Sequence, residues 1–177
     1  MKTAIFAVLF LAAPCGAKEK KVKQTPSEIE SLASFTLPPG WEVEKGAGPD
    51  PSLRASRGRH LLRVRLFGGP KSRYDAPAKY LTGLESTTMG RPPERDGSAK
   101  VAGGELPVYR HGYPIELGDP HLVSPDSPKL ATERFVLVPA GKRFFVLSYA
   151  FESSIPDPSG DGTKAWEAFL KGFAPRR

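Results

Sequence analysis

The stretch ATERFVLVPAGKRFFVLSYAFE, residues 131–152, decides the fold. Two apolar runs, 131–138 and 143–152, flank the tetrapeptide Pro139-Ala140-Gly141-Lys142, whose composition is typical of a turn. Apolar side chains recur at every second residue of the later run, so a strand places them on one face: Phe145, Leu147, Tyr149 and Phe151. The stretch therefore predicts a β-hairpin with one aromatic face that another apolar element has to cover.

The following residues predict the element that covers this face. Thr163 is expected to cap a final helix that ends at about Gly172. Its apolar side chains recur at helical spacing and form one stripe: Trp166, Phe169, Leu170 and Phe173. Full burial of each contributes roughly 1.5–3 kcal/mol, so we expect the helix to dock on the hairpin.

A second clear strand precedes the hairpin. Leu61–Phe67 reads LLRVRLF, and its alternation places leucine and valine on one face and Arg63 and Arg65 on the other. Weaker patterns predict a short helix over Pro26–Ala33 and a half-buried strand with Trp41, Val43 and Lys45 on one side. A helix over Ala76–Thr88 is expected to be capped by Asp75. After it we expect a Pro-rich turn over Arg91–Asp96, a hairpin or bulged strand over Val101–Ile115 and a loop over Gly118–Lys129.

Strands joined mostly by turns, with few helices, indicate the α+β class. We expect a single domain over residues 28–174 in which helices pack on an antiparallel β-sheet. The segment before it is expected to be a signal peptide over 1–17, because Lys2 precedes a ten-residue apolar run and small residues precede Lys18. Residues 18–27 then form a basic flexible tail. The alternative is a lipoprotein acylated at Cys15, anchored to the outer membrane or the cell surface.

Composition narrows the range of functions. One cysteine excludes an internal disulfide and every Cys-based metal cluster, and the lack of Asn excludes N-glycosylation and a catalytic Asn. Two stretches offer candidate metal ligands: the set of His111, Asp119 and His121, and a calcium-loop pattern over Asp157–Gly162. The former has no ligand spacing, and the latter has Ala168 where a calcium loop needs Glu, so it is expected to be a turn. No metal or cofactor is expected.

Charge is concentrated in one segment. The chain has a formal net charge of +7, and seven basic residues without an acid stand between Asp50 and Asp75: Arg54, Arg57, Arg59, Arg63, Arg65, Lys71 and Arg73. If a strand and its paired neighbour present them outward, the first five form an anionic-ligand surface, because guanidinium forks suit carboxylates and phosphates. An ordinary solvated strand face is the alternative. The expected partner is an acidic protein, lipid or glycan, with no nucleic acid and with a membrane only if the chain is lipidated.

The residues Phe35-x-Leu37-Pro38-x-Gly40-Trp41 resemble the opening motif of the PsbP/Mog1-like α/β/α sandwich group. Later features have counterparts in order: a basic strand, a helix over Tyr74–Leu84, a Gly-centred strand over Val101–Tyr109, an aromatic hairpin and a closing aromatic helix. The resemblance implies a non-catalytic binding or assembly role, as in photosystem II accessory subunits, nuclear-transport factors and bacterial envelope proteins. It implies structural roles for Phe35, Pro38, Gly40 and Trp41.

These observations predict an exported bacterial envelope protein, secreted or periplasmic, that acts as a non-catalytic binding or accessory module. An envelope hydrolase is the alternative from another class, because scattered Ser, His and acidic residues can assemble in space without a sequence motif. The sequence shows no hydrolase, phosphate-loop or dinucleotide motif.

Overall fold

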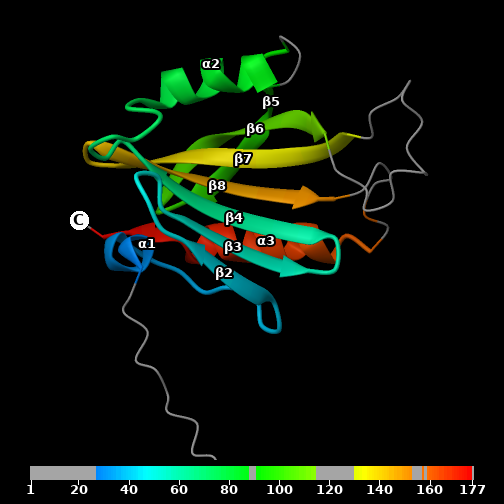
Figure 1. Ribbon diagram of the computed structural model, residues 1–177. Coiled ribbons are helices and arrows are strands. Elements are labelled where there is room, and N and C mark those ends of the chain that lie inside the picture. The colour runs from blue at the N-terminus through cyan, green and yellow to red at the C-terminus, as the bar shows by residue number, and fades with distance from the viewer. Residues whose placement is uncertain (1–26, 88–90, 115–129, 153–156, 158, 177) are drawn as a thin grey trace, which may run out of the picture.

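The computed structural model describes residues 27–87, 91–114, 130–152, 157 and 159–176, and these form an α+β domain (Figure 1). Seven antiparallel strands form one sheet in the order β2-β3-β4-β8-β7-β6-β5, and β1 and β9 form a separate two-stranded ribbon. The predicted fold class is confirmed. Among the described residues, no helix has the length and apolar character needed to cross a membrane.

In the described part of the chain, three helices alternate with two runs of consecutive antiparallel strands, β2 to β4 and β5 to β8. The helices are α1 (Glu28–Leu32), α2 (Pro77–Thr87) and α3 (Asp161–Gly172). The strands are β1 (Ala33–Ser34), β2 (Glu42–Gly46), β3 (Ser52–Arg57), β4 (His60–Phe67), β5 (Glu94–Val101), β6 (Gly104–Pro114), β7 (Leu130–Ala140), β8 (Arg143–Phe151) and β9 (Ala174–Pro175).

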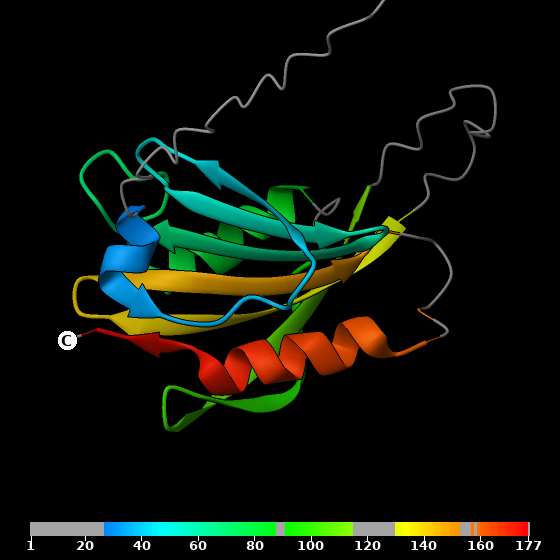
Figure 2. The same cartoon turned by 90° about the horizontal axis from the view of Figure 1, so that it is seen from below.

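Helix α3 packs on one face of the sheet, where the main core lies (Figure 2). Its aromatic stripe meets the aromatic face of β8: Trp166 stacks on Tyr149, and the Phe173 ring lies 5.2 Å from that of Phe145. Phe35, in the segment after β1, contacts the rings of Phe169 and Phe173. The predicted docking of the last helix on the last hairpin is therefore confirmed.

Helix α2 packs on the opposite face and covers one end of the sheet (Figure 1). Tyr80 is buried there among Phe67, Phe135 and Phe144. This second core is smaller than the first, and the rest of the face carries polar side chains from the central strands. The sheet thus lies between helices, and the larger of its two apolar cores is on the α3 face.

The start of α3 corrects one prediction. The helix begins at Asp161, with Gly160 at the cap position in a left-handed conformation (φ 65°), so Thr163 lies inside the first turn. The carboxylate of Asp157 accepts hydrogen bonds from the backbone N–H groups of Ser159 and Gly162. A side chain upstream of Thr163 thus accepts from a helix-terminal N–H, the role expected of the Thr163 cap.

Two further predictions are wrong at the edge strands of the sheet, β2 and β5. All side chains of β2 are exposed, and Val43 is 45% exposed, because this edge strand extends beyond the cover of α3. The segment predicted as a Pro-rich turn becomes strand β5 from Glu94 onward, and it pairs with β6 through a tight turn at Ala102 and Gly103, both with positive φ. Strand β5 is polar and mostly exposed, so it shows no apolar alternation.

Candidate functional site

A buried carboxylate, that of Glu133 on β7, lies at the centre of a charged cluster on the α2 side of the sheet. Strand pairing places Glu133 directly opposite His111 on β6, and the imidazole Nε2 lies 2.8 Å from the carboxylate Oε2. The other carboxylate oxygen lies 3.2 Å from Nη2 of Arg65 and 3.6 Å from Nη1 of Arg63, both on β4. Three cationic or imidazole groups from two strands thus meet on one acid.

The electrostatics of the cluster favour an ionised Glu133. Burial by itself raises the pKa of this carboxyl, but the hydrogen bond with His111, the charges of Arg65 and Arg63 and the hydroxyl of Ser148 outweigh burial and lower the pKa to about 2. An isolated buried carboxylate is strongly disfavoured, so these partners are what allows it here. The acid in turn fixes the position of both guanidinium groups.

Both arginines contact the buried Glu133, and part of each guanidinium side chain is exposed to solvent. Their side chains are 29% (Arg63) and 23% (Arg65) exposed, whereas that of Glu133 is 4% exposed. The guanidinium of Arg65 also lies over the ring of Tyr80 on α2, 5.7 Å from its centroid. Arg63 lies 3.9 Å from the carboxylate of Glu152. A partly exposed pair of guanidiniums, each placed by other side chains, results.

Ser148 on β8 completes the cluster. It is 1% exposed, its hydroxyl oxygen accepts from Nη2 of Arg65 at 3.5 Å, and its hydroxyl contributes to the lowered pKa of Glu133. In a Ser/His/acid hydrolase the imidazole lies between the hydroxyl and the acid, and the hydroxyl must reach substrate. Here the acid lies between the hydroxyl and the imidazole, and the hydroxyl is buried.

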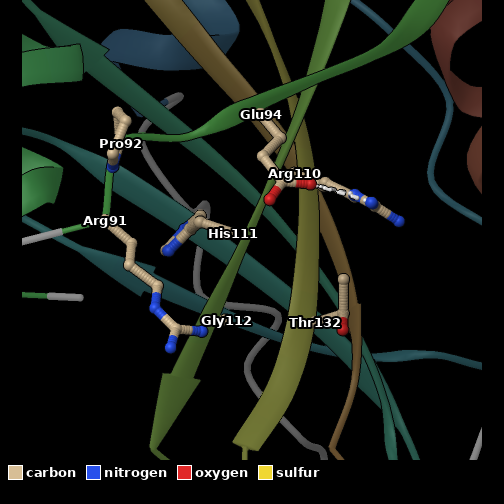
Figure 3. A pocket seen from close by; sticks show the side chains of 7 residues that line it. All are labelled: Arg91, Pro92, Glu94, Arg110, His111, Gly112 and Thr132. Carbon is tan, nitrogen blue, oxygen red and sulfur yellow. Dashed lines mark hydrogen bonds and ion pairs between the residues drawn. The ribbon is translucent and has the colours of Figure 1, made fainter. Parts of the chain in front are cut away.

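A small polar pocket adjoins the cluster at His111 (Figure 3). It has a volume of about 150 Å³ and lies where β6 continues past the last residue pair with β5. Arg91 and His111 lie on one side of β6, and Arg110 and Thr132 on the other, with Arg110 bonded to Glu94 (Figure 3). This volume is below the range of small-molecule pockets, so it suits a single charged group of a larger partner.

The arginines predicted as one surface divide between several places. Arg54 pairs in register with Arg63 and shares its face, and it forms an ion pair with Glu44 at 3.7 Å. Arg57 lies on the opposite face, with its guanidinium 5.9 Å from the centroid of Trp41, and Arg59 lies in the turn between β3 and β4. The structure brings together three of the five, Arg54, Arg63 and Arg65.

The two other basic residues of the predicted segment lie in a different part of the fold. Lys71 and Arg73 are in the segment between β4 and α2, where the guanidinium of Arg73 lies over the ring of Tyr74. Cys15, Asp119 and His121 lie outside the described residues. Within the part of the chain that the structure describes, no group of three or more His, Cys, Asp or Glu side chains is placed to hold a metal ion.

Sequence reasoning missed Glu133 and Ser148 and used His111 only as part of a metal set. A signal was present, because each is a polar residue two positions from apolar residues on the same strand: Glu133 between Ala131 and Phe135, and Ser148 between Val146 and Ala150. Polar side chains at such positions require partners. The pattern indicates that partners exist without identifying them.

Comparisons with known proteins find distant structural similarity only. No family model and no curated protein matches the chain. A crystal structure from Bacteroides thetaiotaomicron is similar with a TM-score of 0.49 and 11% identity over 83% of this chain, which spans about half of that protein (46%). LpqN, involved in cell envelope biogenesis of Mycobacterium tuberculosis, is similar with a TM-score of 0.37 and 13% identity over 82% of this chain and 83% of its own.

Proposed function

We propose that this chain is a non-catalytic binding or accessory module of the bacterial envelope that holds an anionic group of its partner against Arg63 and Arg65. One observation carries the proposal. A single buried carboxylate, Glu133, fixes both guanidiniums, and each keeps about a quarter of its side chain exposed. Guanidiniums held in place lose little freedom when they bind a carboxylate or phosphate, and this preorganisation favours affinity.

The surroundings support recognition of a charged group within a larger partner. The polar pocket at His111 adds Arg91 to the same region of the sheet, and its volume of about 150 Å³ fits one carboxylate or phosphate. The resemblance to the PsbP/Mog1-like group implies a binding or assembly role, and an antiparallel sheet between helices agrees with that resemblance. An exported location remains part of the proposal because residues 1–17 have the pattern of a signal peptide.

The hydrolase alternative finds no support in this cluster. The order of contacts from Ser148 to Glu133 to His111 gives the serine no activating imidazole, and the hydroxyl is buried. The lipoprotein variant concerns attachment rather than the site. Mass spectrometry of the N-terminus from the native host separates a diacylglyceryl Cys15 from a chain beginning at Lys18.

A binding titration tests the proposal. Wild type is titrated at low and moderate salt with three polyanions: phosphatidylglycerol vesicles, polyglutamate and alginate. We expect salt-sensitive binding to one of the three, because charges at an exposed surface are screened within about 8 Å at physiological ionic strength. The double variant Arg63→Gln/Arg65→Gln is expected to lose this binding.

Two further variants keep the test independent of folding. Arg63→Lys/Arg65→Lys preserves both charges beside Glu133 but removes the guanidinium forks, so the folded protein is expected to bind more weakly than wild type. Lys164→Gln/Lys171→Gln removes the same net charge as the Gln pair from α3 on the other side of the sheet, and is expected to bind as wild type does. Equal binding by all four proteins, or binding of no polyanion by wild type, would refute the proposal.

A further inference from the structure

A second hollow lies on the other side of the sheet, between α3 and the segment that joins β1 to β2. This groove has a volume of about 340 Å³, within the range of small-molecule sites. The joining segment runs alongside α3 (Figure 2), and the rigid Pro38-Pro39 pair forms one wall. The groove exists because α3 presents two small residues, Ala165 and Ala168, toward that wall.

The lining is apolar with a single cation. Phe169 (2% exposed) and Trp41 (7% exposed) are ordered by the core, so they form a fixed apolar surface. Of the described lining residues, two carry a charged or hydroxylic side chain, Thr36 and Arg57. The guanidinium of Arg57 lies 5.9 Å from the centroid of the Trp41 ring, so the charge is held at the groove by a cation–π contact.

We propose that this groove binds a single-chain amphiphile, a linear acyl chain with a terminal carboxylate. The chain lies on Trp41 and Phe169 between the proline wall and α3, and the carboxylate meets Arg57. Apolar surface removed from water supplies most of the affinity, and the guanidinium gives the ligand its orientation. The site is separate from the Arg63 and Arg65 pair, since Arg57 lies on the opposite face of the sheet.

The lining favours an acyl chain over a peptide. Each peptide unit that enters an apolar groove brings an N–H and a C=O group, and leaving them without hydrogen-bond partners costs free energy. The hydroxyl of Thr36, the indole N–H of Trp41 and the guanidinium of Arg57 are the polar side-chain groups that the described lining offers. A linear fatty-acid anion fits this lining because its only polar group is the terminal carboxylate and the rest of the molecule is apolar.

Equilibrium dialysis of the full chain with radiolabelled decanoate, below the micelle concentration, tests the proposal. Wild type is expected to bind decanoate saturably at one site. Ala168→Phe fills the groove from an exposed helix position and is expected to abolish binding, and Glu167→Phe adds the same ring at the adjacent exposed position and is expected to retain it. Arg57→Gln is expected to weaken decanoate binding about tenfold, in line with the loss of one charge-assisted hydrogen bond.

Two controls separate this site from other ways of binding an anion. Decanol lacks the charge, so its binding is expected to be the same in wild type and Arg57→Gln. Arg63→Lys/Arg65→Lys is expected to bind decanoate as wild type does, because that pair lies on the other face. Absence of saturable binding by wild type, or equal binding by folded Ala168→Phe, overturns the proposal and leaves the binding role of Arg63 and Arg65 unaffected.

Discussion

The two faces of the seven-stranded sheet are stabilised by different interactions, although the same strands contribute side chains to both. On the α3 face, the buried core side chains of β3, β4, β7 and β8 are apolar, and the contacts among them are mainly between hydrocarbon groups. On the α2 face, aromatic packing ends next to Arg65, and a buried acid holds the remaining polar side chains together. An apolar face loses stability roughly in proportion to what is removed, whereas a charged cluster depends on each member.

The largest effect is expected on the apolar face. Trp166→Ala removes a side chain that is 2% exposed and stacks on Tyr149 and Phe169, so we expect a loss of about 3–5 kcal/mol. Urea denaturation followed by circular dichroism measures it. Glu167→Ala, an exposed neighbour on α3, serves as the control and is expected to change stability by about 0.5 kcal/mol or less. A loss under about 1 kcal/mol in Trp166→Ala would mean that the stripe is not core.

On the charged face, Glu133→Gln keeps the shape and removes the charge. We expect a loss of about 3 kcal/mol at pH 7, since the two guanidiniums then lose the acid with which both pair. The pKa of Glu133 is lowered from its ordinary value of 4.5 to about 2 in the folded chain. Its contribution is therefore complete above about pH 5 and is lost as pH falls from 5 to 2.

Denaturation of wild type and Glu133→Gln at several pH values measures this difference. The two stability curves are expected to differ by about 3 kcal/mol at pH 7 and to converge toward pH 2. A constant difference from pH 7 to pH 2 would show that the carboxylate is not held by its charged partners. The contrast between the two faces predicts that Trp166→Ala has no comparable pH dependence.

The smallest effect is expected at the edge of the cluster. Ser148→Ala removes one hydroxyl that hydrogen bonds with Glu133, for an expected loss of about 1 kcal/mol. Because this hydroxyl lowers the pKa of Glu133, the variant is expected to titrate at a higher pH. An NMR titration of the Glu133 carboxyl checks the direction. An unchanged pKa would limit the role of Ser148 to packing.

Sequence periodicity anticipated the apolar face well. The apolar residues recur at every second position in β4 and β8 and at helical spacing in α3. Each of these local patterns predicts which side of its element is buried in the core. The edge strands did not follow it: β5 reads ERDGSAKV because both of its sides are mostly exposed, and Val43 faces solvent. Periodicity reports burial, so a strand that is not buried leaves no such signal.

Sequence periodicity predicted the two arginines of the charged cluster but not the acid that they contact. Spacing of two correctly placed Arg63 and Arg65 on one face, and spacing of three separates Arg54 from Arg57. Glu133 reaches them because β8 lies between β4 and β7, an order that the chain does not follow. Residue pairing across strands far apart in sequence is set by the whole sheet, so no local pattern contains it.

The small β1–β9 ribbon has a consequence for the order of folding. It pairs Ala33 with Pro175 and Ser34 with Ala174, and the backbone N–H of Arg176 donates to the carbonyl of Leu32. Contacts of such high sequence separation form only after the chain between them has become compact, since closing a long loop costs entropy. Helix α1 and strand β1 are therefore completed by residues that follow α3 in the chain, so a variant cut before β9 forms its seven-stranded sheet without this pairing at α1 and β1.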